Sequence, residues 1–275
     1  MLSQALRADV DRMIDHEAST RLGDDIEALH QMRVSTRRLH STLRTFQPVL
    51  DRSWARDLRG RLRGTAAALG DVRDLDVLLE RLDAESVDGS DTLAEGIRAI
   101  HAVLEDRRGQ TRTRLLEVLD DPGHAVLLHD LLEAAAAPHC LDPEPPAGLL
   151  LPPLITKAWH RLRRAEGSMP LHDVRIRAKR LRYAAEAAES AFGSPARKLA
   201  KAAGRAQKIL GKHQDAVVAR ATYLSLLPRL GTDPATAFAL GVLVAREEAR
   251  RDGAADAWPA VWKGVRVVAK DDFWH

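Results

Sequence analysis

Two segments of this chain, 142 positions apart, share one pattern of residues. Residues 29–39 read LHQMRVSTRRL, and residues 171–181 read LHDVRIRAKRL. A second pair follows in the same order, because LGDVRDLDV begins at Leu69 and LGKHQDAVV begins at Leu210. Two pairs of similar segments at nearly equal offsets indicate an internal duplication, so the chain is expected to fold into two similar units.

Apolar residues recur at spacings of three and four along almost the whole chain, which is typical of amphipathic α-helices. We find no segment with the pattern of a strand. The fold class that we predict is all-α, with two pseudo-symmetric helical bundles of the four-helix type that arise from the duplication. The expected helices cover roughly residues 3–20, 26–46, 52–83, 91–118, 124–136, 153–165, 171–191, 196–227, 234–251 and 257–269.

Prolines are concentrated at residues 138–153, which read PHCLDPEPPAGLLLPP. Proline lacks a backbone N–H group and cannot continue a helix, so this segment is interpreted as a linker. The predicted organisation is a first helical bundle at residues 1–137, the linker at 138–153 and a second bundle at 154–275. Each half is long enough to bury a core of its own.

A basic face lies beside the apolar face of each repeated segment. At about 100° per residue, an arc of about 80° contains five basic side chains, those of His30, Arg33, Arg37, His40 and Arg44, while Arg38 lies outside it. Apolar residues such as Met32 and Leu39 occupy the neighbouring arc, which predicts that one face packs while its neighbour stays basic. The second copy shows the same partition, although Glu186 stands where the first copy has Arg44.

The helix after each copy is expected to add a further row of cations. The predicted binding residues are His30, Arg33, Arg37, His40, Arg44, Arg56, Arg59 and Arg63 in the first half, and His172, Arg175, Lys179, Arg182, Lys198, Lys201, Arg205, Lys208 and Lys212 in the second. The net charge is only +3, so these local rows matter more than the total. Cations at spacings of three and four repel one another, and a polyanion would relieve that repulsion. Such rows can also be ordinary solvated faces; the duplication favours binding.

The sequence shows no constellation typical of a metal site or of catalysis, and we predict no metal, no cofactor and no catalytic residue. His30 and His172 have neither an HExxH pattern nor a cysteine cluster beside them. A His-Asp pair begins at His129, but adjacent side chains of a helix point about 100° apart. We expect the histidines of the basic faces to donate to phosphate and to make binding sensitive to pH. Acids such as Asp74 are expected to pair with arginines such as Arg38.

The segments LHQMRVSTRRL, LGDVRDLDV, LHDVRIRAKRLRY and LGKHQDAVV, in this order, resemble the CHAD family of histidine-containing α-helical domains over nearly the whole chain. The resemblance implies two bundles around a basic central groove or pore that binds inorganic polyphosphate. The phosphate contacts that it implies are His30, Arg33, Arg37, His172, Arg175 and Lys179. Arg73 has no cationic counterpart in the second copy, which puts a role for it in doubt. Some members carry a fused β-barrel domain that hydrolyses triphosphate, and no strand-rich segment here corresponds to it.

We therefore predict a protein that is not an enzyme and that binds inorganic polyphosphate, with targeting to polyphosphate granules and a protein partner that acts on the polymer. The alternatives are a metal-dependent hydrolase of polyphosphate or phosphate esters, and a nucleic-acid-binding protein. Aromatic residues make up 4% of the chain, which supplies few platforms for base stacking. The single cysteine, the charged N-terminus and the lack of a long apolar run predict a cytoplasmic protein without a membrane partner.

Overall fold

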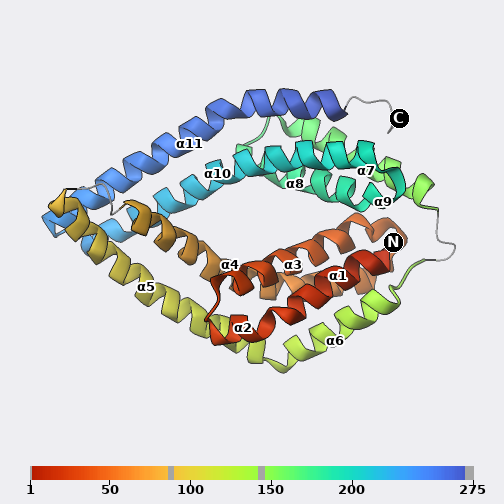
Figure 1. Ribbon diagram of the computed structural model, residues 1–275, viewed down its shortest axis with the longest axis horizontal. Helices are drawn as coiled ribbons and strands as arrows, with labels where there is room; N and C mark the ends of the chain where they lie inside the picture. The colour runs from red at the N-terminus through yellow and green to blue at the C-terminus, as the bar shows by residue number, and fades with distance from the viewer. Residues whose placement is uncertain (1, 86–89, 142–145, 270–275) are drawn as a thin grey trace. The chain divides into compact units, whose positions relative to one another are not determined.

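The computed structural model describes residues 2–85, 90–141 and 146–269, and within these ranges the chain is helical without a β-strand (Figure 1). The helices are α1 Leu2–Asp15, α2 Glu17–Leu22, α3 Ile26–Thr45, the 3-10 helix η1 Gln47–Val49, α4 Arg52–Glu85, α5 Asp91–Asp120, α6 Pro122–Ala136, α7 Ala147–Ala165, α8 Leu171–Ala187, α9 Glu189–Phe192, α10 Ser194–Leu230 and α11 Pro234–Ala269. The prediction of an all-α fold is thereby confirmed.

Two helices extend beyond the breaks expected from the sequence. Helix α11 runs without interruption through the region of Gly253, where glycine costs about 1 kcal/mol relative to alanine. Trp258 and Trp262 lie beyond this point and are each 6% exposed, so burial of two large side chains outweighs the local cost. Helix α7 begins at Ala147, inside the segment interpreted as a linker, while residues 142–145 of that segment lie outside the described residues.

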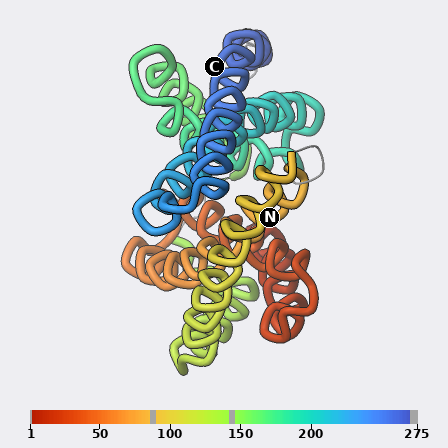
Figure 2. The backbone as a smooth tube through the Cα atoms, turned by 90° about the vertical axis from the view of Figure 1, so that its left-hand side faces the viewer, coloured from red at the N-terminus to blue at the C-terminus, as the bar shows by residue number. Residues whose placement is uncertain are grey.

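The chain forms two compact units. The first contains residues 1–83 and 101–145, and the second contains residues 84–100 and 146–275. The first turns of α5, up to residue 100, thus belong to the second unit, although the sequence predicted that they lie in the first bundle. The continuous helix α5, drawn in yellow in Figure 2, contributes to both units.

The start of α5 approaches α11 closely within the second unit because Gly96 has no side chain. A Cβ atom at this position would lie 2.6 Å from the Cβ of Ala239 and would also meet the carbonyl oxygen of Ala235. A glycine in the middle of a helix is unfavourable by itself. Here it allows the two helix backbones to pack together, which explains its place in the sequence.

Each unit has its own apolar core. In the first unit α1 packs against α3 and α6, and in the second α10 packs against α8 and α11 while α7 packs on α8. The predicted packing face of α3 is confirmed, because Met32, Leu39 and Leu43 are fully buried. The equivalent face of α8 is confirmed as well, since Val174 and Leu181 are fully buried. No helix in the described ranges combines the length and the apolar character needed to span a membrane.

Candidate functional site

The first basic residues of α3 lie together at the contact between α3 and α4 in the first unit. Arg33 donates to Asp74 of α4 over 3.0 Å. The backbone of Gly70 leaves space beside this guanidinium, since a Cβ there would lie 3.6 Å from Arg33 Nε. Asp74 thus pairs with an arginine, as the sequence led us to expect, whereas Arg38 donates to Asp9 of α1. Asp74 therefore orients a residue of the predicted binding face.

His30 is surrounded by positive charge. Burial lowers the pKa of His30, and the charges of Arg73, Arg33 and Arg37 lower it further against an opposing contribution from Glu27. Its Nδ1 atom is buried and has no hydrogen-bond partner among the described residues. The lowered pKa means that His30 favours the neutral form more than an isolated histidine does, and an anion bound beside it would favour uptake of a proton.

A second group of cations forms where α4 begins. The pKa of Arg59 is lowered, first by burial and then by the charges of Arg44 and Arg63. Arg59 donates from one terminal nitrogen to Gln47 over 3.3 Å, while its Nε atom is buried and lacks a partner in the described part of the chain. These arginines from α3 and α4 repel one another, so a bound anion would relieve an unfavourable interaction. Of the other predicted residues here, Arg56 is exposed and His40 is half-buried.

In the second unit, the basic row of α8 is held by polar contacts from α10 and by one aromatic ring. His172 Nδ1 lies 2.8 Å from the side-chain oxygen of Gln214 on α10. The charged groups of Lys179 and Arg182 lie 5.8 and 5.9 Å from the centre of the Tyr183 ring, within the range of a cation–π interaction. Arg175 is half-buried on the same row.

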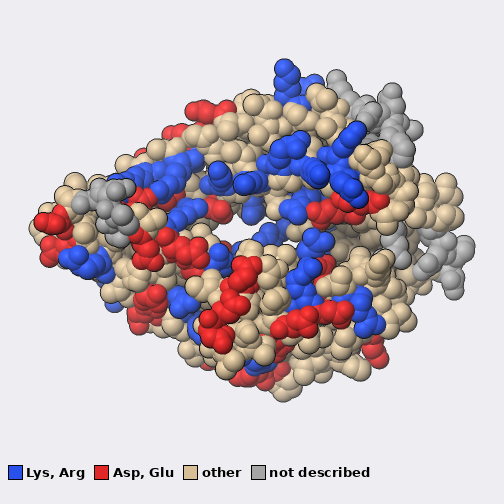
Figure 3. All heavy atoms as spheres, viewed as in Figure 1, with Lys and Arg blue, Asp and Glu red and all other residues tan. Residues whose placement is uncertain are grey.

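Helix α10 carries a row of five lysines and arginines. Its members are Lys198, Lys201, Arg205, Lys208 and Lys212, and all five are exposed. Within the ranges that the structure describes, none of them forms an ion pair or a side-chain hydrogen bond. Figure 3 shows Lys and Arg side chains gathered along this helix. Five cations on one helix face without carboxylate partners leave a strong, uncompensated positive potential.

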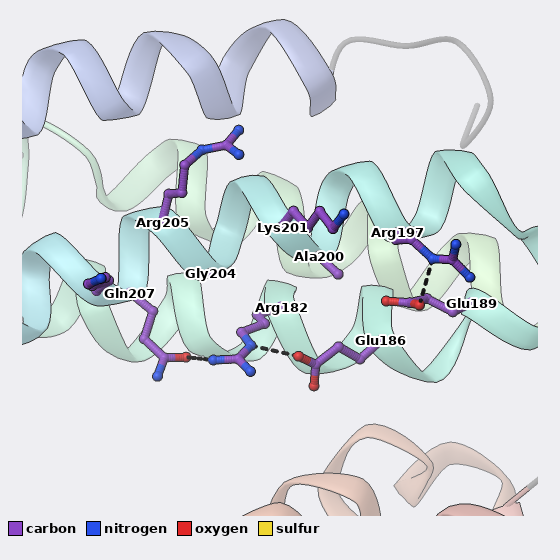
Figure 4. A pocket seen from close by; sticks show the side chains of 10 residues that line it. Arg182, Glu186, Glu189, Arg197, Ala200, Lys201, Gly204, Arg205 and Gln207 are labelled. Atoms are coloured by element: carbon purple, nitrogen blue, oxygen red, sulfur yellow. Dashed lines mark hydrogen bonds and ion pairs between the residues drawn. The ribbon is translucent and has the colours of Figure 1, made fainter.

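A hollow with a volume of about 720 Å³ lies over α8, α9 and α10 in the second unit (Figure 4). Its residues are Arg182, Glu186, Glu189, Arg197, Ala200, Lys201, Gly204, Arg205, Gln207 and Lys208. Ala200, with only a methyl side chain, and Gly204, with none, form part of the lining. The hollow therefore brings together four of the residues predicted from the sequence and adds Arg197, which the sequence analysis did not select.

The two carboxylates of the hollow are each bound to an arginine. Glu186 accepts from Arg182 Nε over 2.6 Å, and Arg182 also donates to Gln207 over 3.4 Å. Glu189 accepts from Arg197 over 3.4 Å. The lysines and Arg205 are left to supply the free positive charge, so the hollow is chemically suited to an anion with several charged groups.

One other cluster has ligand atoms close enough for a metal ion. His129, Asp130 and Glu133 of α6 place one ligand atom each within 4.8 Å of one another. His129 lies 3.4 Å from Glu133, whereas Asp130 already accepts from Arg61 over 2.6 Å. Glu133 lies four residues after His129 and three after Asp130, so both residues are its neighbours on the helix surface, and this cluster was not expected from the sequence.

Comparisons with known proteins find both a family and structural relatives. A family model described as the CHAD domain matches residues 4–224. Two uncharacterized proteins of Mycobacterium tuberculosis, MT2285 and Rv2226, are each 29% identical to this chain over 266 residues. These matches cover 89% of this chain but 49% of each relative, so the chain spans about half the length of the curated relatives it matches.

Two solved structures share the fold. PptA from Streptomyces chartreusis superposes with a TM-score of 0.72 and 26% sequence identity, over 95% of this chain and 98% of the other. The CHAD domain from the plant Ricinus communis superposes with a TM-score of 0.71 and 25% identity, over 97% and 92% of the two chains. The similarity thus extends over both units of the fold.

Proposed function

Since this chain belongs to the CHAD domain family, we propose that it binds inorganic polyphosphate on the basic faces of its helices and does not catalyse a reaction of the polymer. The observation that carries the proposal is the row of five exposed cations on α10, from Lys198 to Lys212, none of which has a carboxylate partner among the described residues. Surface cations ordinarily alternate with acids that compensate them. A row of cations without acidic partners is suited to a linear ligand that carries negative charges along its length.

The dimensions of the row agree with a linear polyanion. Fourteen residues separate its ends, which corresponds to about 21 Å along a helix. The Cβ atoms of neighbouring members are about 5 to 6 Å apart at spacings of three and four. A flexible phosphate chain laid along α10 would meet several cations in succession, and the hollow beside Lys201, Arg205 and Lys208 gives it room to approach. Each contact would release condensed counterions and make the affinity depend on salt.

We propose that the first unit supplies a second binding surface, formed by the positions of the first repeat that correspond to the basic rows of α8 and α10. Its parts are the group around His30 and Arg33 and the group around Arg59. Both contain cations that repel one another, and both contain a buried nitrogen atom without a hydrogen-bond partner in the described residues. An entering phosphate oxygen would satisfy such donors and reduce the repulsion.

Two observations support binding without catalysis. The carboxylates of the hollow are engaged by Arg182 and Arg197, which leaves them poorly placed to hold a metal ion. In the α6 cluster, Asp130 is bound by Arg61. Hydrolysis of a phosphoanhydride needs metal ions or acids placed beside the phosphates. In the cell, the binding activity would place the protein on polyphosphate granules in the cytoplasm, beside a partner that acts on the polymer.

The proposal is tested by calorimetric titration with long-chain polyphosphate at two salt concentrations, with release of phosphate monitored in the same samples. RNA of matched charge serves as competitor. We expect tight, salt-sensitive binding that RNA does not displace, without release of phosphate. Preference for RNA would indicate a nucleic-acid-binding protein, and metal-dependent release of phosphate would indicate a hydrolase; either result overturns the proposal.

A pair of variants locates the binding surface. The charge reversal Lys201→Glu with Arg205→Glu is expected to reduce the affinity strongly, because both side chains line the hollow. The matched control is Lys157→Glu with Arg161→Glu on α7, which makes the same change of charge at exposed positions of the same unit outside the hollow. Equal losses in the two variants would mean that only the net charge matters and that α10 is not the binding surface.

A further inference from the structure

The carboxylate of Glu186 is paired with the guanidinium of Arg182, which an anion in the hollow would otherwise contact. Its carboxylate accepts from Arg182 Nε over 2.6 Å, and Figure 4 shows the two side chains pointing toward one another beside Gln207. Both groups remain accessible, since 32% of the Arg182 side chain and 22% of the Glu186 side chain is exposed. A ligand can therefore compete with Glu186 for Arg182 without unfolding the helices around them.

We propose that Glu186 is a built-in competitor that makes the hollow select long phosphate polymers over short ones. This inference rests on the proposed function and assigns a specificity-determining residue within it. In the duplicated position of the first repeat the residue is Arg44, whose charge lowers the pKa of nearby Arg59. The same place in the two repeats thus carries opposite charges, and only the second unit holds a carboxylate there.

A competing group that belongs to the protein itself lowers the affinity for small ligands more than the affinity for long ones. A carboxylate fixed beside Arg182 acts at an effective concentration of about millimolar or more, so a free short anion must displace it at that disadvantage. A short phosphate held in the hollow also meets the negative charge of Glu186 in every pose. A long polymer can bind the α10 row at Lys198 or Lys212, outside the hollow, and keeps most of its contacts whether or not Arg182 is released.

Glu189 is a second and weaker competitor for an arginine of the hollow. It accepts from Arg197 over 3.4 Å, and 62% of the Arg197 side chain is exposed, so solvent already screens this pair. The two carboxylates lie on the α8 and α9 side of the hollow, whereas the cations without partners belong to α10. A polymer is accordingly expected to enter along α10.

The experiment compares wild-type protein with Glu186→Gln by calorimetric titration with tripolyphosphate and with long-chain polyphosphate. Glutamine keeps an oxygen that can accept from Arg182 and removes only the charge. We expect the affinity for tripolyphosphate to rise about fivefold and that for the long polymer to change less than about twofold. The control is Glu248→Gln, which removes one charge from a pair with Arg220 outside the hollow and is expected to leave both affinities within about twofold.

Each result decides between distinct explanations. An equal gain in Glu248→Gln would show that net charge alone is responsible and would overturn the inference. Weaker binding by Glu186→Gln, with an unchanged melting temperature, would show that Glu186 positions Arg182 for the ligand and would overturn it too. If Glu186→Gln does not fold, the variant Glu189→Gln takes its place and is expected to raise the affinity for tripolyphosphate by a smaller factor. An unchanged affinity in Glu189→Gln would then refute the inference. Failure of wild-type protein to bind the long polymer would overturn the proposed function itself.

Discussion

Neutralising two cations of the α10 row, by Lys201→Ala with Arg205→Ala, is expected to reduce the salt dependence of polyphosphate binding by a calculable amount. The row offers five exposed cations without carboxylate partners in the described residues. With the single-strand coefficient of nucleic acids, five contacts give a slope of log affinity against log salt of about −3.5, and three contacts give about −2. Between about 50 and 200 mM salt, the contacts of the α10 row would then contribute a fall in affinity of about 100-fold for wild-type protein and about 20-fold for the variant.

The assay is a fluorescence or calorimetric titration with long-chain polyphosphate at four salt concentrations, for wild-type protein, the double variant and the double variant Lys157→Ala with Arg161→Ala on α7. Circular dichroism confirms equal helicity. The α7 variant is expected to keep the wild-type slope because both residues lie on α7, outside the hollow and the α10 row. A double variant at Lys201 and Arg205 that keeps a slope near that of wild-type protein would refute the assignment of these two side chains to phosphate contacts.

Three further predictions concern stability and pH. Leu39→Ala is expected to reduce the free energy of unfolding by about 2 to 5 kcal/mol in urea denaturation without changing the affinity of the folded protein, since Leu39 is fully buried. Gly96→Ala is expected to cost about 1 to 3 kcal/mol by the same measurement, because the new Cβ would lie 2.6 Å from that of Ala239, and an unchanged stability would contradict this close approach. Burial and neighbouring arginines lower the pKa of His30 in the free protein, and a bound polyanion is expected to raise this pKa, so that binding is accompanied by uptake of a proton. The affinity for polyphosphate, measured by titration, is therefore expected to rise as the pH falls from about 7.5 to 5.5. This rise is expected to be smaller in His30→Gln.

The helices could be predicted because their signal is local. Apolar spacing identified α3, α8 and the long helices α4 and α10, with ends that differ by a few residues from those observed. The breaks were less predictable. Separate helices were expected at residues 234–251 and 257–269, whereas burial of Trp258 and Trp262 favours the continuous helix α11. Prolines indicated a linker up to residue 153, whereas the burial of Leu151 and Ile155 favours a helix that begins earlier.

The candidate site was predicted in part. The sequence identified the cations of α10, and the hollow contains three of them together with Arg182 from α8. It did not identify Arg197, although this residue lies four positions before Lys201 and therefore on the same side of α10. Arg73 was doubted because the second repeat lacks its counterpart, yet its charge acts on His30. A role in binding for these residues stays a prediction, as do the internal duplication and a groove shared by the two repeats.

The sequence by itself determined the helical class, the buried face of α3 and of α8, and the unbroken row of cations on α10. These properties follow from the order of residues along one helix, where position alone fixes the direction of each side chain. Only the tertiary structure decided that Arg33 pairs with Asp74 while Arg38 pairs with Asp9, and that Glu186 holds Arg182 at the edge of a hollow. Such pairings depend on which helices pack together and at what rotation, and that choice is made by the burial of apolar surface from distant parts of the chain.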